Sequence, residues 1–222
     1  MVPGSPPIEL APQSVTNVRC NGESNGTASV NVTNANGATT ITWMPGGLSG
    51  ASVTGLAANT YTVSIVDADG CTADTMITIT EPPLLEITGI TLDNGLDCNG
   101  DGDASATASG LGGTPPLDYL WDANASSQAT ATATGLSAGT YTVTITDANG
   151  CTDEESITIT EPNAVEVTGV AISQDILCFG DTNGEATATG IGGTGTLSYL
   201  WDANAGSQAT PTATGLGAGT YE

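Results

Sequence analysis

Residues 135–162, GLSAGTYTVTITDANGCTDEESITITEP, predict a β-hairpin. Val143 and Ile145 alternate with threonines, which is the period of a strand that is buried on one face. Ile157 and Ile159 repeat this alternation after the segment DANG, and Asn-Gly favours tight hairpin turns because both residues tolerate positive φ. No stretch of the chain has a convincing helical period, so the sequence predicts an all-β protein.

The chain repeats this pattern with a period of about 80 residues, and a long internal period of this kind indicates a repeat architecture. Each copy carries a cysteine, a tryptophan 23 residues later and then a tyrosine after a Gly-Leu pair: Cys20, Trp43 and Tyr61; Cys98, Trp121 and Tyr141; Cys178, Trp201 and Tyr221. Internal repeats of this length indicate a string of small domains rather than a solenoid. We expect domains at residues 1–82, 83–162 and 163–222, with the third ending before its last two strands.

The aromatic residues point to a tandem array of immunoglobulin-like β-sandwich domains. A tryptophan in a central strand and a Gly-Thr-Tyr lead-in to a late strand are typical of that sandwich. We interpret Trp43, Trp121, Trp201, Tyr61, Tyr141 and Tyr221 as structural core with a corner hydrogen bond, in preference to a ligand site. In LLEITGITL, the apolar phase changes at Gly89, which predicts a β-bulge or a strand that crosses between sheets.

The composition excludes most catalytic and nucleic-acid functions. The net charge is −23, with one base (Arg19) and no histidine. Such a charge repels nucleic acid and anionic lipid surfaces. Without histidine the usual general base is missing, so we expect no enzyme. No segment resembles a membrane span or a signal peptide, and polar, cysteine-containing repeats favour a secreted protein.

The cysteines recur once or twice in each copy, and we predict one disulfide inside each domain. Cys20 and Cys71 are 51 residues apart, and Cys98 and Cys151 are 53 residues apart. Closing such a loop would stabilise a domain by about 4 kcal/mol. Cys178 is then left as an unpaired thiol. The alternatives are a metal site, which the lack of CxxC pairs and histidines disfavours, and pairing between neighbouring domains, which the distance from the Glu-Pro junctions disfavours.

This pairing requires Cys98 and Cys151 to lie at the same end of the sandwich. Six strands of alternating direction satisfy that requirement, whereas a seven-strand meander does not. We therefore expect little or no separate strand between Trp121 and the segment that begins at Ala129.

The same arrangement would bring two acidic turns together in each domain. Their oxygens are candidate Ca²⁺ ligands: Glu23, Asp67, Asp69, Asp101, Asp103, Asp147, Asn149, Asp181, Asn183 and Glu185. The EF-hand pattern fails after Asp101, because its late glutamate is missing. Asp-x-Asn-Gly also forms ordinary turns, which is the interpretation that we favour, with Ca²⁺ kept as a hypothesis.

These residues together resemble the SprB-type repeat, which is named after a giant surface adhesin of gliding bacteria. The resemblance is carried by residues 135–162 and by CNGDGDASATASGLGGTPPLDYLW and CFGDTNGEATATGIGGTGTLSYLW, and it extends over most of the chain. It implies tandem domains of large exported surface proteins, typically delivered by type IX secretion, with roles in adhesion and gliding. The family pattern implies no catalytic residues.

Two functions follow as hypotheses. The first is a non-enzymatic adhesin or stalk segment at the cell surface, in contact with neighbouring repeats and with surface glycans or other copies of itself, without nucleic acid or membrane insertion. The second is a filament subunit whose unfinished third domain accepts a strand from a neighbour. Size and shape in solution distinguish a monomeric rod from concentration-dependent fibres.

Overall fold

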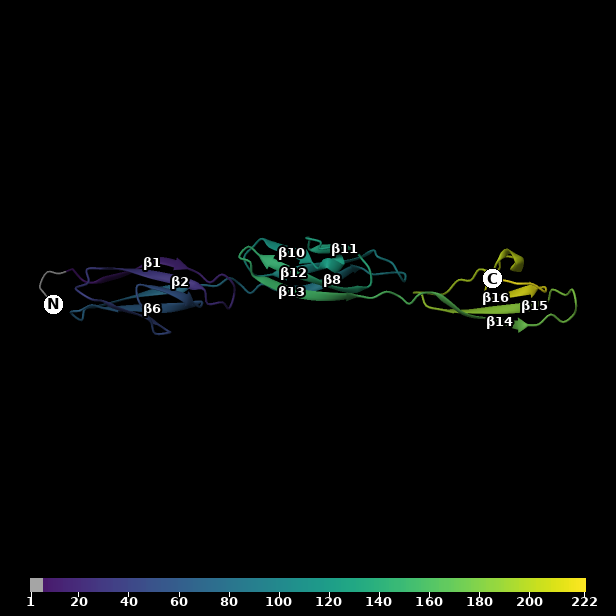
Figure 1. The fold of residues 1–222 in the computed structure, drawn as a ribbon, viewed down its shortest axis with the longest axis horizontal. Helices are drawn as coiled ribbons and strands as arrows, with labels where there is room; N and C mark the ends of the chain where they lie inside the picture. Colours follow the sequence, from purple (N-terminus) through teal and green to yellow (C-terminus); the bar gives the residue numbers. More distant parts are fainter. Residues whose placement is uncertain (1–5) are drawn as a thin grey trace.

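The protein is all-β, with three groups of strands that lie end to end (Figure 1). The computed structural model describes residues 6–222. We call the groups the N-terminal unit (β1–β7), the central unit (β8–β13) and the C-terminal unit (β14–β16). The ends of a unit that face the N- and C-terminal directions of the chain are its N- and C-terminal poles. The domain limits at 82/83 and 162/163 stay predictions, and residues 1–5 of the first predicted domain lie outside the described residues.

The N-terminal unit has two sheets, β1-β2-β5 and β4-β3-β6-β7. The strands are β1 (Glu9–Thr16), β2 (Gly26–Thr33), β3 (Thr40–Met44), β4 (Leu48–Ser49), β5 (Ser52–Leu56), β6 (Asn59–Val66) and β7 (Thr72–Ile79). Trp43, Val63 and Ile65 have no solvent exposure and lie in one apolar cluster with side chains of both sheets.

The central unit has the same two-layer arrangement, with sheets β11-β9-β8 and β10-β12-β13. Its elements are β8 (Glu86–Asn94), β9 (Ala104–Leu111), β10 (Leu117–Trp121), the 3₁₀ helix η1 (Ala123–Ala125), β11 (Thr132–Leu136), β12 (Gly139–Asp147) and β13 (Thr152–Ile159). The hairpin expected in residues 135–162 is β12–β13, in which Tyr141 faces Ile157. The alternation puts Val143 and Ile145 in the core, both without solvent exposure. The prediction of strands from period and turn residues is confirmed here.

The C-terminal unit consists of one sheet, β14-β15-β16, in the described part of the chain. Its elements are β14 (Glu166–Gln174), β15 (Gly184–Ile191), the 3₁₀ helix η2 (Ala203–Ala205) and β16 (Thr212–Leu216). Its core is small and centres on Trp201, with Ala205, Ala213 and Leu216 buried around it.

A β-bulge interrupts the pairing of β8 with β9, as the phase change at Gly89 predicts. The register shifts between Ile87 and Gly89, and Gly89 has φ +151°. Leu85 and Ile87 are buried before the bulge, and Ile90 packs against the same core after it. A single bulge therefore explains how both phases of this strand face the core.

Each late tyrosine closes a corner of its unit. The hydroxyl groups of Tyr61, Tyr141 and Tyr221 donate to the carbonyl oxygen four residues earlier, at 3.1, 3.0 and 2.9 Å. The indole N–H groups of the tryptophans also find carbonyl acceptors, at 2.9–3.0 Å. Buried Tyr and Trp polar groups usually need such partners.

The chain reverses direction between the tryptophan strand and the next strand, which the sequence did not predict. In the N-terminal unit β4 pairs antiparallel with β3, although it has only two residues. The central unit has η1 instead, and the Trp121 N–H donates to the Gln128 carbonyl (2.9 Å). The expectation of little or no separate strand between Trp121 and Ala129 is confirmed in the central unit. The segment still turns the chain back, however, so the inferred strand directions are wrong from this point on.

Candidate functional site: the disulfide-linked junction

A disulfide joins the N-terminal unit to the central unit. It links Cys20 to Cys151, which are 131 residues apart in sequence, with their Cα atoms 5.7 Å apart. Cys71, Cys98 and Cys178 are free in the described residues. The predicted pairs Cys20–Cys71 and Cys98–Cys151, and with them an internal disulfide in each domain, are therefore wrong for this structure.

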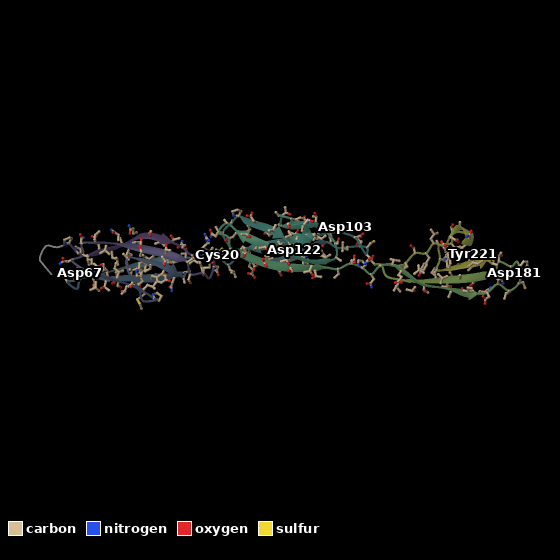
Figure 2. The ribbon with its side chains drawn as sticks, in the orientation of Figure 1. Cys20, Asp67, Asp103, Asp122, Asp181 and Tyr221 are labelled. Atoms are coloured by element: carbon tan, nitrogen blue, oxygen red, sulfur yellow. A yellow bond between two sulfur atoms is a disulfide. The ribbon has the colours of Figure 1, made fainter. Side chains whose placement is uncertain are left out.

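The correction follows from the chain reversal. Cys20 lies in the loop between β1 and β2, at the C-terminal pole, whereas Cys71 follows the turn between β6 and β7, at the N-terminal pole. Figure 2 shows Cys20 beside the junction with the central unit and Asp67, which precedes Cys71, at the opposite end of the same unit. The two sulfurs of one unit thus lie at opposite poles. At the first junction the facing poles therefore carry one cysteine each, Cys20 from the N-terminal unit and Cys151 from the central unit.

Hydrogen bonds from the Cys20 loop fix the peptide that connects the two units. Asn21 Nδ2 donates to the Pro82 carbonyl (3.0 Å), and the Gly22 N–H donates to the Glu81 carboxylate (2.7 Å). From the central unit, Asn149 Nδ2 donates to the Arg19 carbonyl (3.0 Å). Together with the disulfide, these contacts hold the linker and the facing loops in one arrangement.

The linker contacts recur after the central unit. Asn99 Nδ2 donates to the Pro162 carbonyl (3.1 Å), and the Gly100 N–H donates to the Glu161 carboxylate (2.7 Å). The sequence marks the Glu-Pro pairs as junctions, but the binding of these linkers by an Asn-Gly pair was not predicted. Its signal is the repeated pairing of an Asn-Gly after the first cysteine with the Glu-Pro that ends the same copy.

Asp67 and Asp147 organise the turns at the N-terminal poles, and they are the buried carboxylates of the described chain. Each accepts the backbone N–H groups two and four residues later, for instance Cys151 N–H to Asp147 (2.9 Å). The pKa of Asp67 is lowered, chiefly by the hydrogen bond from the Asn36 N–H. Burial acts to raise the pKa of Asp147, but hydrogen bonds from backbone N–H groups, first that of Thr114, outweigh it and lower the pKa.

The two acidic turns of one unit lie at opposite poles, so the prediction that they meet is wrong. Figure 2 shows Asp103 at the end of the central unit that faces the C-terminal unit. The Asp147 turn lies at the other end, because it directly precedes Cys151, which is bonded to Cys20. In residues 6–222 no three His, Cys, Asp or Glu side chains form a group that could hold a metal ion. The remaining Ca²⁺ candidates are distributed over the same two kinds of turn: Glu23, Asp101, Asp181, Asn183 and Glu185 near C-terminal poles, and Asp67, Asp69 and Asn149 near N-terminal poles.

Two open clefts lie at the two junctions. The first, of about 330 Å³, is lined by the disulfide and by Leu84 and Leu85. The second, of about 490 Å³, is lined by Cys98, Val165 and Leu197 among others. Over residues 6–222, no helix has the length and apolar character that a membrane crossing requires.

The SprB repeat family model matches residues 13–48 and 170–206. Two segments of the chain match the SprB repeat. Both matches begin shortly before the first cysteine of a copy. They end five residues after the tryptophan of that copy, which is Trp43 in the first match and Trp201 in the second. The predicted resemblance to the SprB repeat is thereby confirmed. None of the curated proteins compared with the chain matches it.

Several solved structures are similar over much of the chain. The IG1+IG2 fragment of DIP-gamma has 12% identity and a TM-score of 0.39, over 71% of this chain and 98% of that one. A C-terminal 282-residue fragment of intimin, in complex with the intimin-binding domain of its receptor Tir, has 16% identity and a TM-score of 0.39 (72% and 66%). A tetra-tandem repeat from the extending region of a large adhesion protein has 14% identity and a TM-score of 0.26 (97% and 64%). TM-scores this low are no basis for assigning a function.

Proposed function

We propose that this chain is a non-enzymatic stalk or adhesin segment of a repetitive bacterial cell-surface protein, built from tandem domains with limits near 82/83 and 162/163. The observation that carries this proposal is the end-to-end order of the units, with the same linker contacts at both junctions (Figure 1). The two SprB repeat matches support it. A role in gliding, delivery by type IX secretion and an extracellular location belong to the same proposal.

The partners in this proposal are neighbouring repeats, surface glycans or other copies of the chain. The charge of −23 disfavours nucleic acid and anionic membranes as partners. The buried carboxylates of the described residues, Asp67 and Asp147, are engaged by backbone N–H groups.

Small-angle X-ray scattering with size-exclusion chromatography tests the stalk. The stalk is supported if the protein stays monomeric at every concentration and its maximum dimension matches three units in line. A compact particle, with the units folded back on one another, contradicts it.

A second candidate function is a filament subunit assembled by strand complementation between units. It is favoured by the apolar side chains that the C-terminal unit exposes, such as Ile172 and Leu200 (73% and 76% exposed). Fibres that grow with protein concentration would support this function and would count against an isolated stalk segment.

A further inference from the structure

The C-terminal unit exposes apolar side chains on a face that the central unit buries. Val165 and Val167 are 67% and 65% exposed, whereas their counterparts in the preceding copy, Leu85 and Ile87, are 7% and 6% exposed. In the central unit this face is in the core shared with β12 and β13, and the Ile87 N–H donates to the Asp153 carboxylate of β13 (2.7 Å). After residue 162 the described chain forms a single sheet, so no second sheet covers this face beyond the small core around Trp201.

The end of the C-terminal unit already follows the path of such a layer. The Asp202 N–H donates to the Glu222 carbonyl (2.7 Å), as the Asp122 N–H donates to the Thr142 carbonyl of β12 (2.9 Å). Glu222 thus occupies the position of Thr142. A strand that continued from this position as β12 does would cross the exposed face, and its hairpin partner would pair as β13 does.

Cys98 has the surroundings of Cys20, which is disulfide-bonded. Each precedes an Asn-Gly pair that binds the linker through the same two hydrogen bonds. The partner of Cys20 is Cys151, directly after the Asp147–Gly150 turn of the β12–β13 hairpin. A hairpin of that kind on the C-terminal unit would put its own cysteine against Cys98, which is exposed.

The second junction also brings the C-terminal unit into contact with the Cys98 loop. Thr194 Oγ1 donates to the Asp97 carbonyl (3.4 Å), directly before Cys98. Its counterpart Thr114 accepts from Asn149, which binds the Arg19 carbonyl before Cys20. The larger cleft at this junction lies beside Cys98 and is lined in part by Val165 of the exposed face.

We propose that Cys98 is one half of a second inter-unit disulfide. Its partner is a cysteine directly after the turn of a β-hairpin of the β12–β13 type, which packs on the exposed face of the C-terminal unit. Bond formation removes one proton and one electron from each of the two thiols, and a small-molecule disulfide such as oxidised glutathione accepts the two electrons and is reduced to two thiols. The hairpin accounts for the uncovered face and for the free thiol together, and it does not depend on whether the chain serves as a stalk or as a filament subunit.

The first test appends the sequence of residues Val143–Pro162 directly after Glu222 of the full chain and refolds it in a glutathione redox buffer. Peptide mapping under non-reducing conditions should find Cys98 linked to the appended cysteine. Hydrogen exchange of the segment 165–172 should slow at least tenfold relative to the original chain, because the face becomes covered. A matched variant with serine in place of the appended cysteine should keep much of this protection but leave Cys98 free.

Three results would overturn the proposal. In the chain that carries the appended cysteine, a protected face with Cys98 still free would refute the disulfide, and an unprotected face would refute the hairpin. A link from the appended cysteine to Cys178 in place of Cys98 would refute the proposed pairing, and Cys178→Ser is the control for that outcome.

Adding the Val143–Pro162 peptide to the original chain tests the source of the hairpin. A Cys98 adduct at micromolar peptide shows that a separate molecule can supply the hairpin. An adduct that forms only with the appended chain assigns the hairpin to the same polypeptide. The scattering experiment on the original chain tests the proposed function independently of these results.

Discussion

Reducing the Cys20–Cys151 disulfide should lengthen the fully stretched chain by about 450 Å, because a stretched residue contributes about 3.4 Å. When the two ends of the oxidised chain are pulled, the force crosses from Cys20 to Cys151 through the disulfide, so the segment between them, a sequence separation of 131, is not extended. Pairing of Cys20 with Cys71 would shield a sequence separation of only 51, and its reduction would lengthen the chain by about 170 Å.

Single-molecule stretching with handles at the two ends measures this difference directly. After all units have unfolded at constant force, a thiol-free phosphine reductant is added, and one extension step of about 450 Å is expected. Cys20→Ser and Cys151→Ser should each give the full length from the start, and Cys71→Ser should leave the step unchanged. A step of about 170 Å that Cys71→Ser abolishes would refute the inter-unit pairing.

Three further outcomes are expected. Cys151→Ser should lower the free energy of unfolding of the central unit by about 4 kcal/mol. While the N-terminal unit is folded, the disulfide closes a loop of about 70 residues around the central unit, and the substitution opens that loop. Hydrogen exchange in urea measures the stability of each unit separately. Gly112→Ala should destabilise the central unit more than Gly100→Ala, since both have positive φ but only at Gly112 would a Cβ lie 1.7 Å from the Leu84 carbonyl oxygen; urea denaturation of the two variants compares them. Because the pKa of Asp147 is lowered from its ordinary value of 3.8, the ionised carboxylate stabilises the fold at pH values above 3.8. This stabilisation is lost as the pH falls through the pKa of the folded state. Acid titration followed by circular dichroism should show a smaller loss of stability for Asp147→Asn than for the original chain.

The strands, the hairpin turns and the bulge could be predicted because each depends on residues close in sequence. Alternation puts Val143 and Ile145 in the core, and Gly89 marks the bulge. The reversal after Trp121 was missed because it rests on a backbone hydrogen bond to Gln128 and on a 3₁₀ turn, and neither has a period. Without the reversal the strand directions are inverted, and the two cysteines of a unit are assigned to the same end.

The cysteine period could not correct that error. The first two copies each carry one cysteine of each kind, and the third carries Cys178 alone. This spacing is consistent with pairing inside a unit and equally with pairing between successive units, because both arrangements repeat once per copy. Chain-entropy reasoning does not separate them either, since the stabilisation rises only slowly with loop length. The two pairings are distinguished only by the pole of the unit at which each cysteine loop lies. That pole depends on the directions of all the strands.

The two pairings have different mechanical consequences. A disulfide inside each unit would shield part of that unit but would leave each linker as the single covalent connection between units. In this structure two covalent connections cross the first junction: the peptide through Glu81 and Pro82, and the Cys20–Cys151 bond. A single backbone cut anywhere between the two cysteines therefore leaves the ends of the chain joined, and bending at the linker is resisted at a second point.

If Cys98 is bonded as proposed, the loop that its disulfide closes begins inside the loop closed by Cys20 and Cys151. The two protected intervals then overlap, and no single backbone cut within either of them separates the units. Such overlap would suit the proposed stalk, in which one broken linker would otherwise release everything beyond it.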